Sequence, residues 1–306
     1  MFGQQTKTLT EVVNFGNNPG NLKLFVHSRT SSTKLPLVVV LHGCGESAKA
    51  VSELTGWNKL ADINEFMVIY PQQKLVNNPN LCFNWFADRD NEKGKGECES
   101  IFEMITFALK NYPIDTGKIF ITGLSAGAAM SVVMAATHPD VFKCSAIFAG
   151  GAYKIAIDAV DGLIALRGTK YIPKKRLIKD VKDQNPNYKG KYPNMIIYQG
   201  LNDAIVNKKN ALVLVNQWTG LNNTDTIADV IEPAFMNIED ITRTQYTDSL
   251  GRTPVILYEV KNLGHKLLIK PGDKENEGGT KGLFGVDKGF HSTYQTAKEF
   301  GILKSH

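Results

Sequence analysis

The sequence predicts an α/β fold in which a mostly parallel central sheet carries helices on both faces. The first observation is a series of short apolar runs, rich in β-branched residues, of which residues 37–41 are one example. Such runs, bounded by turn residues, are typical of buried strands. The second observation is that amphipathic stretches with helical spacing lie between the runs. Strands that alternate with helices indicate parallel strands joined by helical crossovers, and such a sheet is covered on both faces.

Each element follows from its local pattern. Buried strands are predicted at residues 37–41, 66–70, 118–122, 145–148 and 195–198. Helices are predicted where apolar residues recur every three or four positions, at about 50–63, from 101 onward, and at 126–137, 208–219 and 292–300. Ser100 and Glu103 fit a capping box before the second of these helices. Two further runs, 244–247 and 254–260, flank a turn at 248–251 and predict a hairpin.

Length and composition favour one large domain without a membrane span. The chain has 306 residues, of which 42% are hydrophobic, and this is ample for a large core. We therefore expect a single domain over residues 1–306, with a polar insertion at about 153–194 over the sheet. No run of 18 apolar residues is present, so no membrane-spanning helix is expected.

The charge distribution does not indicate a nucleic-acid partner. The net charge of +5 comes from 35 basic and 30 acidic residues, which is a mild excess. Residues 170–191 hold eight basic and two acidic side chains, but they lack the aromatic interleaving that is typical of a stacking surface for bases. We expect this stretch to be a solvated helix and loop.

A nucleophile is predicted at Ser125. The segment Gly123-Leu124-Ser125-Ala126-Gly127 fits G-x-S-x-G and lies between a predicted strand and a predicted helix. This is the context of a nucleophile elbow, in which a sharp turn exposes the serine hydroxyl and small neighbours let the backbone approach closely. The alternative is a tight turn of small residues with a capping serine.

A serine nucleophile needs a general base and a carboxylate that orients the base, in the chain order Ser, acid, His. His265 directly follows the predicted strand 254–260 and is the expected base, with His291 as its rival. Asp203 follows the strand 195–198 and is the expected acid, although it could simply cap the next helix. Other candidates lie in less suitable places: His138 at a helix end expected at the surface, His306 at the terminus, and Asp240 and Asp248 in a polar insertion and a turn.

Backbone N–H groups are expected to stabilise the oxyanion. One should belong to Ala126, the residue after the nucleophile. The other should come from the loop after the strand 37–41, where small residues follow His42, and we assign it to Cys44. His42 precedes Ser125 in the chain and is expected to be structural.

These motifs together resemble the polyhydroxybutyrate depolymerase-like esterases, a group that overlaps with the feruloyl and acetyl xylan esterases of carbohydrate esterase family one. The resemblance covers about residues 22–303 and rests on His42-Gly43-Cys44, Cys82-Phe83-Asn84-Trp85-Phe86, the Ser125 motif, Gly200-Leu201-Asn202-Asp203 and Gly264-His265. It implies an α/β-hydrolase fold, a triad of Ser125, Asp203 and His265, and no cofactor or metal. It also implies a secreted or periplasmic protein. Residues 1–8 do not form a signal peptide, so we expect that one has been removed.

The resemblance also bears on the cysteines and on Trp85. Cys44 and Cys82 occupy the two cysteine positions of the family motifs, which implies a disulfide; free thiols and a Cys82–Cys98 bridge are the alternatives. Cys98 and Cys144 lie outside the motifs and are not assigned. Trp85 could stack on an aromatic acyl group or a sugar, or it could belong to the core.

The predicted function is that of a serine carboxylesterase that works through an acyl-enzyme. Its expected partner is an ester substrate that can be linked to a polymer: feruloyl or acetyl esters on plant polysaccharide, or short polyester and hydroxyalkanoate esters. A polyhydroxybutyrate or other polyester depolymerase is the alternative. Two observations weigh against this alternative. Leu267 lies two residues after His265, where polymer depolymerases often have a Trp, and the sequence shows no Ser/Thr-rich linker or separate substrate-binding domain. A non-catalytic binding protein is the alternative of another class, and the oligomeric state is left open.

Overall fold

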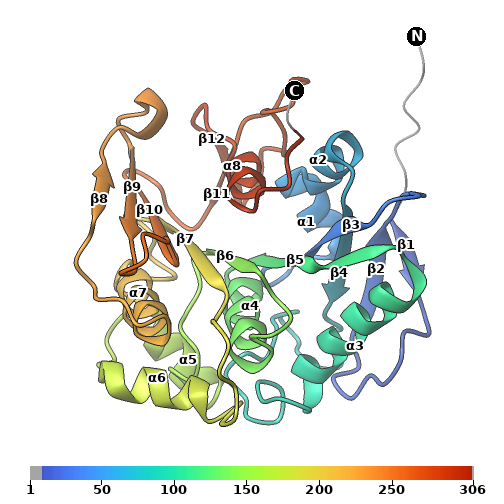
Figure 1. The fold of residues 1–306 in the computed structure, drawn as a ribbon, viewed down its shortest axis with the longest axis horizontal. Helices are drawn as coiled ribbons and strands as arrows, with labels where there is room; N and C mark the ends of the chain where they lie inside the picture. Colours follow the sequence, from blue (N-terminus) through green and yellow to red (C-terminus); the bar gives the residue numbers. More distant parts are fainter. Residues whose placement is uncertain (1–8, 305–306) are drawn as a thin grey trace.

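The computed structural model describes residues 9–304, and a ten-stranded sheet forms its centre (Figure 1). The strand order is β1-β2-β4-β3-β5-β6-β7-β10-β9-β8. From β4 to β10 the neighbouring strands run parallel, whereas β1, β2, β9 and β8 pair antiparallel at the two edges. The prediction of a mostly parallel sheet is confirmed.

The strands form where the sequence predicted apolar runs, with somewhat longer bounds. The parallel strands are β3 (Leu35–Leu41), β4 (Met67–Gln72), β5 (Ile114–Leu124), β6 (Cys144–Phe148), β7 (Asn194–Gly200) and β10 (Val255–Val260). The edge strands are β1 (Thr10–Val12), β2 (Lys23–His27), β8 (Val230–Glu232) and β9 (Ile241–Tyr246), and β9 and β10 form the predicted hairpin. A separate pair, β11 (Leu267–Ile269) and β12 (Gly285–Asp287), follows the main sheet.

Helices cover both faces of the sheet, so each face has its own buried core (Figure 1). One face is covered by α1 (Ala48–Thr55), α2 (Trp57–Asn64) and α8 (Ser292–Glu299). The other is covered by α3 (Gly96–Asn111), α4 (Ala126–Thr137), α5 (Ala159–Leu166), α6 (Lys174–Lys182) and α7 (Lys209–Leu221). A short 3₁₀ turn, η1 (Phe235–Asn237), lies before β9.

Two predictions about helix boundaries are wrong. The helix expected over 50–63 is divided into α1 and α2 at Gly56, whose φ of 73° is left-handed. A Cβ there would lie 2.7 Å from the backbone nitrogen of Gly279, so a close approach of two chain segments requires glycine. The capping box at Ser100 is not formed, because α3 begins at Gly96 and the Ser100 hydroxyl bonds the Gly96 carbonyl inside the helix.

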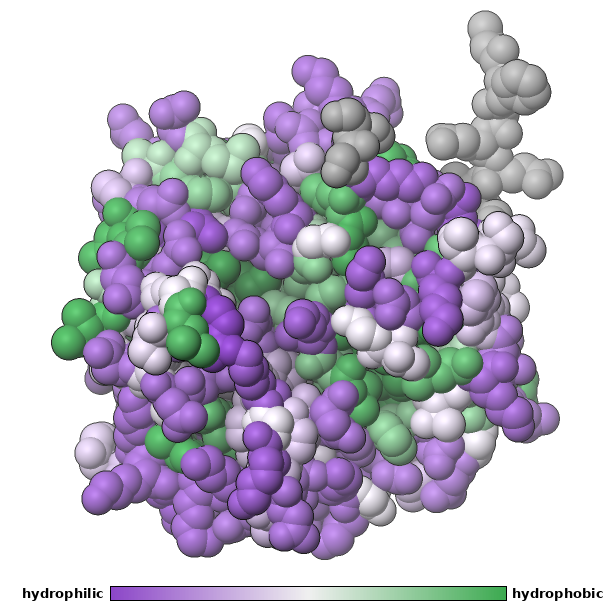
Figure 2. Space-filling view, viewed as in Figure 1, coloured by the Kyte–Doolittle hydropathy of each residue, from purple (hydrophilic) through white to green (hydrophobic). Residues whose placement is uncertain are grey.

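The insertion at about 153–194 contains α5 and α6, on the same side of the sheet as α4 and α7 (Figure 1). The basic α6 packs against α7 and α4, and its Arg176 and Lys179 pair with Asp180 and Asp183 at the surface. The face of the molecule drawn in Figure 2 is mostly hydrophilic and is interrupted by separate apolar patches. Among residues 9–304, no helix has both the length and the apolar character that crossing a membrane requires.

Candidate active site

Ser125 lies in a strained turn between β5 and α4. Its backbone has φ 57° and ψ −119°, a conformation that ordinary residues adopt only where the surrounding chain enforces it. Both glycines of the motif are needed for packing. A Cβ on Gly123 would lie 2.4 Å from the Gly127 backbone, and one on Gly127 would lie 2.4 Å from the His42 carbonyl oxygen. The start of α4 therefore packs directly against the end of β3, as a nucleophile elbow requires.

Asp203 and His265 form a buried pair at the same edge of the sheet. They follow β7 and β10, which are parallel neighbours, and Nδ1 of His265 lies 2.7 Å from Oδ2 of Asp203. The other carboxylate oxygen accepts the N–H groups of Ile205 and Val206 at 2.9 and 2.8 Å. Both oxygens of the carboxylate are therefore held by hydrogen-bond partners, which fixes its orientation toward His265. With Nδ1 bound to Asp203, Nε2 is the imidazole nitrogen left to accept a proton.

The sheet order places the elbow close to this pair. Ser125 follows β5, and its N–H donates to the Phe148 carbonyl at the end of β6. Ala149, which follows β6, donates its N–H to the Tyr198 carbonyl of β7. These bonds connect the carboxyl ends of β5, β6 and β7, and β10 is the next strand in the sheet. Catalytic groups in parallel sheets collect at this carboxyl edge. The arrangement matches the roles predicted for Ser125, Asp203 and His265, which stay predictions.

The loop after β3 leaves one backbone donor free. The Gly43 N–H donates to Glu46 at 2.8 Å, and the Gly45 N–H donates to the Asn80 carbonyl at 2.9 Å. The Glu46 N–H donates to the Gly43 carbonyl at 3.3 Å. Within residues 9–304, the Cys44 N–H has no acceptor at hydrogen-bonding distance. This supports Cys44 as a donor of the anion hole, beside Ala126, whose N–H lies in the unsatisfied first turn of α4.

His42 is a structural residue, as predicted from its position in the chain. Its Nε2 accepts the Gln73 N–H at 3.0 Å, so Nδ1 carries the ring proton and donates to the Gly43 carbonyl at 2.7 Å. The ring is fully buried, and burial lowers its pKa to about 4. His42 therefore stays neutral and holds the loop that follows it.

The rival histidines lie in the core. His291 is buried before α8, and its Nε2 lies 3.0 Å from the Thr55 carbonyl oxygen; burial lowers its pKa to about 4. The expectation that His138 lies at the surface is wrong. Its ring is 2% exposed, stacks on Phe102 at 4.4 Å, and contacts Thr137. A helix end is not exposed here because α3 packs beside α4.

The Cys44–Cys82 disulfide is present, as the resemblance implied, and the rival bridge is not formed because Cys98 is a free, buried thiol. Cys144 is also free and buried. Trp85 is 5% exposed, with its ring 5.5 Å from that of Phe86 and against Gly162 of α5. This packing supports the core role of Trp85 rather than substrate contact.

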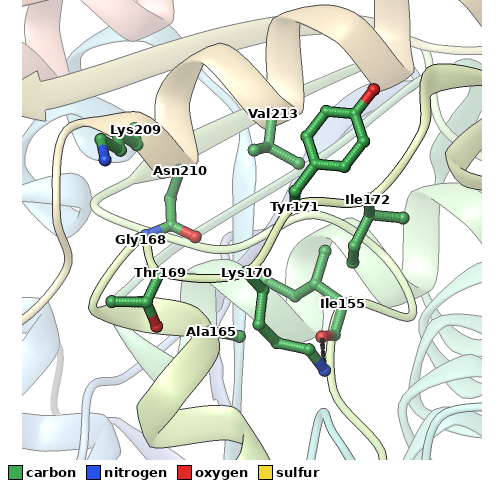
Figure 3. Close-up of a pocket in the computed structure, with 10 residues that line it drawn as sticks. All are labelled: Ile155, Ala165, Gly168, Thr169, Lys170, Tyr171, Ile172, Lys209, Asn210 and Val213. Carbon is green, nitrogen blue, oxygen red and sulfur yellow. Dashed lines mark hydrogen bonds between the residues drawn. The ribbon is translucent and has the colours of Figure 1, made fainter.

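Sequence reasoning missed Glu46, whose buried carboxylate accepts the N–H of Gly43, the residue before Cys44. The only signal was a carboxylate three residues after Gly43 in a run of small residues. A cavity of about 290 Å³ lies elsewhere, between the loop after α5 and the start of α7 (Figure 3). None of the three catalytic candidates lines it, and the Lys170 ammonium beside it is bound to the Ile155 carbonyl. In the described part of the chain, no group of three or more His, Cys, Asp or Glu side chains could hold a metal ion.

Comparison with known proteins gives the family. A family model described as Esterase PHB depolymerase matches residues 21–230. Poly(3-hydroxyalkanoate) depolymerase C of Paucimonas lemoignei is 37% identical over 298 residues, which is 96% of this chain and 70% of that protein. The acetylxylan esterase of Coprinopsis cinerea is 32% identical over 221 residues, and the match covers 70% of this chain but only 59% of that protein.

A solved structure agrees in fold. The acetyl xylan esterase from Aspergillus awamori superposes with a TM-score of 0.77 at 24% identity, over 85% of this chain and 94% of that one. The matched segment 21–230 includes the Ser125 elbow, Cys44 and Asp203, while the long match to the depolymerase spans nearly the whole chain. The chain has an α/β-hydrolase fold and belongs to the esterase PHB depolymerase family.

Proposed function

We propose that this chain is a serine carboxylesterase in which Ser125, His265 and Asp203 carry the reaction. The observation that supports this most directly is the 2.7 Å contact between His265 Nδ1 and Asp203 Oδ2, at the sheet edge where the Ser125 elbow lies. That contact orients the imidazole so that Nε2 is free to act as a base. Together the three side chains supply the nucleophile, the general base and the orienting acid that acyl transfer from an ester uses.

The proposed reaction has two stages. His265 Nε2 takes the Ser125 proton while the hydroxyl oxygen attacks the ester carbonyl, and Asp203 stabilises the imidazolium. The N–H groups of Cys44 and Ala126 bind the oxyanion. The imidazolium then protonates the leaving alcohol, and an acyl-enzyme remains on Ser125. Water attacks this ester in the second stage with His265 again as the base, and the acid and Ser125 are released.

For the substrate, we propose esters of short hydroxyalkanoate chains. The depolymerase relative is 37% identical and its match covers 96% of this chain, whereas the acetylxylan esterase match covers 70%. Of the substrates that the sequence analysis named, this favours the hydroxyalkanoate esters over the polysaccharide esters, and it also supports the depolymerase alternative. Acetyl esters on xylan are the second candidate, favoured by the 32% identity to the Coprinopsis enzyme. The disulfide supports a secreted or periplasmic location, because such bonds persist in oxidising compartments.

The test compares wild-type protein with Ser125→Ala, and with Ser32→Ala as an exposed serine control. Nitrophenyl butyrate reports ester cleavage, while a 3-hydroxybutyrate oligomer, acetylated xylan and methyl ferulate report the substrate class. We expect Ser125→Ala to lower kcat on the order of 10⁴-fold or more and Ser32→Ala to leave it unchanged. Full activity in Ser125→Ala would reject the proposed nucleophile, and faster release of acetate from xylan than cleavage of the oligomer would favour the second candidate.

A further inference from the structure

We propose that Glu46 is a positioning residue of the anion hole. Its carboxylate binds the Gly43 N–H and thereby restrains the residue whose carbonyl shares a peptide with the Cys44 N–H. The inference rests on the proposed function, since it concerns the same Ser125 site.

The first step is geometric. The Glu46 side chain lies in the turn that leads from β3 into α1, is 9% exposed, and accepts the Gly43 N–H at 2.8 Å. On its other side, Gly43 is bound through its carbonyl, which accepts from His42 Nδ1 at 2.7 Å. In a trans peptide the carbonyl of one residue and the N–H of the next point in opposite directions. Binding both polar groups of Gly43 therefore sets the direction of the Cys44 N–H.

The second step concerns what would happen without the carboxylate. Gly43 has no side chain to restrict its dihedral angles, so its backbone relies on hydrogen bonds to keep one conformation. Its carbonyl bond to His42 would remain if Glu46 lost its carboxylate, but its buried N–H would lose its acceptor. An unsatisfied buried N–H is unfavourable and drives the local backbone to rearrange. A small rotation of the 43–44 peptide moves the Cys44 N–H away from a developing oxyanion, which weakens transition-state binding more than substrate binding.

The third step is electrostatic. Burial raises the pKa of Glu46, while the Gly43 hydrogen bond and the charge of His265 lower that pKa. The Gly43 hydrogen bond therefore favours the ionised carboxylate, which is the stronger acceptor for this N–H. His265 faces Asp203 on its other side. On α1, Lys49 and Glu53 lie 3.9 Å apart at the surface and face each other rather than Glu46.

The test separates the hydrogen bond from the charge. Glu46→Ala removes both, whereas Glu46→Gln keeps an amide oxygen that can accept the Gly43 N–H but removes the charge. Glu53→Ala and Glu53→Gln are matched controls, because Glu53 is an exposed carboxylate seven residues later. Each variant is assayed for kcat and KM on nitrophenyl butyrate from pH 5 to 9, after thermal unfolding has been measured to verify folding.

We expect Glu46→Ala to lower kcat about 10- to 100-fold with KM within about threefold of wild type, as for a misaligned oxyanion donor. Glu46→Gln should keep most of kcat, because its amide oxygen can still accept the Gly43 N–H. Both Glu53 variants should match wild type.

Two results would overturn the inference: a kcat of Glu46→Ala within threefold of wild type, or a folded Glu46→Gln whose kcat lies more than about tenfold below wild type. The second result decides the matter even if Glu46→Ala does not fold. Ser125→Ala, assayed alongside, separates this failure from a failure of the proposed function. An inactive Ser125→Ala with an unimpaired Glu46→Ala rejects only the role of Glu46, whereas a fully active Ser125→Ala rejects both.

Discussion

Removal of the Cys44–Cys82 disulfide should lower stability far more than activity. The bond joins residues 38 positions apart, and closing a loop of that length restricts the unfolded chain by about 4 kcal/mol. We therefore expect the double variant Cys44→Ser/Cys82→Ser to lose up to about 4 kcal/mol of unfolding free energy. Activity at low temperature should stay within a few-fold of wild type, because hydrogen bonds to Gly43 and Gly45 still hold the loop.

The assay is urea unfolding, followed by fluorescence, together with ester hydrolysis at about 10 °C, where the folded state of both proteins is populated. Wild type treated with a reductant should behave like the double variant, and the double variant should not respond to the reductant. Cys98 and Cys144 should not interfere, since both are buried and burial raises the pKa of the Cys98 thiol to about 12. An unchanged unfolding midpoint, or a large loss of kcat in folded double variant, would refute the reasoning.

Three further predictions follow. His265→Ala should lose activity as severely as Ser125→Ala. His291→Ala should keep most activity at low temperature, because His291 contacts the Thr55 carbonyl in the core. The reverse order of the two variants in the nitrophenyl assay would assign the base to His291. Acid should destabilise the protein, because burial lowers the pKa of His42, His138 and His291 to about 4. Each histidine contributes about 3 kcal/mol to the free energy of unfolding; this contribution is complete above pH 6.5 and is lost as the pH falls toward 4. Glu97, with a pKa near 8, acts in the opposite direction: its contribution is present below pH 4.5 and is lost as the pH rises to 8. Urea unfolding at pH 7 and pH 4.5 measures the balance, and equal stability at both would contradict it. Nitrophenyl esters of two to four acyl carbons should be cleaved faster than those of ten or more. The cavity beside α7 is not lined by the catalytic candidates, so it does not provide a pocket for a long acyl chain at the proposed site. An optimum at ten or more carbons would contradict the proposed substrate.

The strands were predictable because burial on both faces gives each one a continuous apolar run. Residues 37–41 and 195–198, for example, lie inside β3 and β7. The helix break at Gly56 was not predictable, because its cause is the close approach of Gly279, more than 200 positions later. The Lys59 ammonium is a similar case: it donates to the carbonyls of Gly272, Lys274 and Glu277, and nothing in its local sequence indicates this.

The candidate site likewise contains residues that the sequence patterns indicated and one that they did not. Ser125 was predictable because the elbow is a local motif whose glycines are required by local contacts. Asp203 and His265 were predictable from strand ends and chain order, since adjacent parallel strands present their loops at one edge. Glu46 was missed because its role depends on a hydrogen bond to Gly43 and on its burial, and neither is encoded in a spacing rule.

The irregular segment 73–97 is best understood as the support of the anion-hole loop. It contacts that loop through the disulfide, through the Asn80 carbonyl that accepts the Gly45 N–H, and through the Gln73 N–H that binds His42. The segment in turn is organised around the buried carboxyl group of Glu97, whose oxygens accept the backbone and side-chain N–H groups of Asn84 at 2.8 and 2.7 Å and the side-chain N–H of Gln73.

A chain without strand partners must satisfy its buried polar groups through side chains, and this accounts for the polar composition of the segment. Its Asn and Gln side chains supply those bonds and make the segment rigid. The glycine-rich loop that carries the Cys44 N–H has little rigidity of its own, because small residues permit many backbone conformations. The precision that an anion hole needs is therefore supplied by Glu46 and by Gln73, Asn80 and Cys82, about 30 to 40 positions later in the chain.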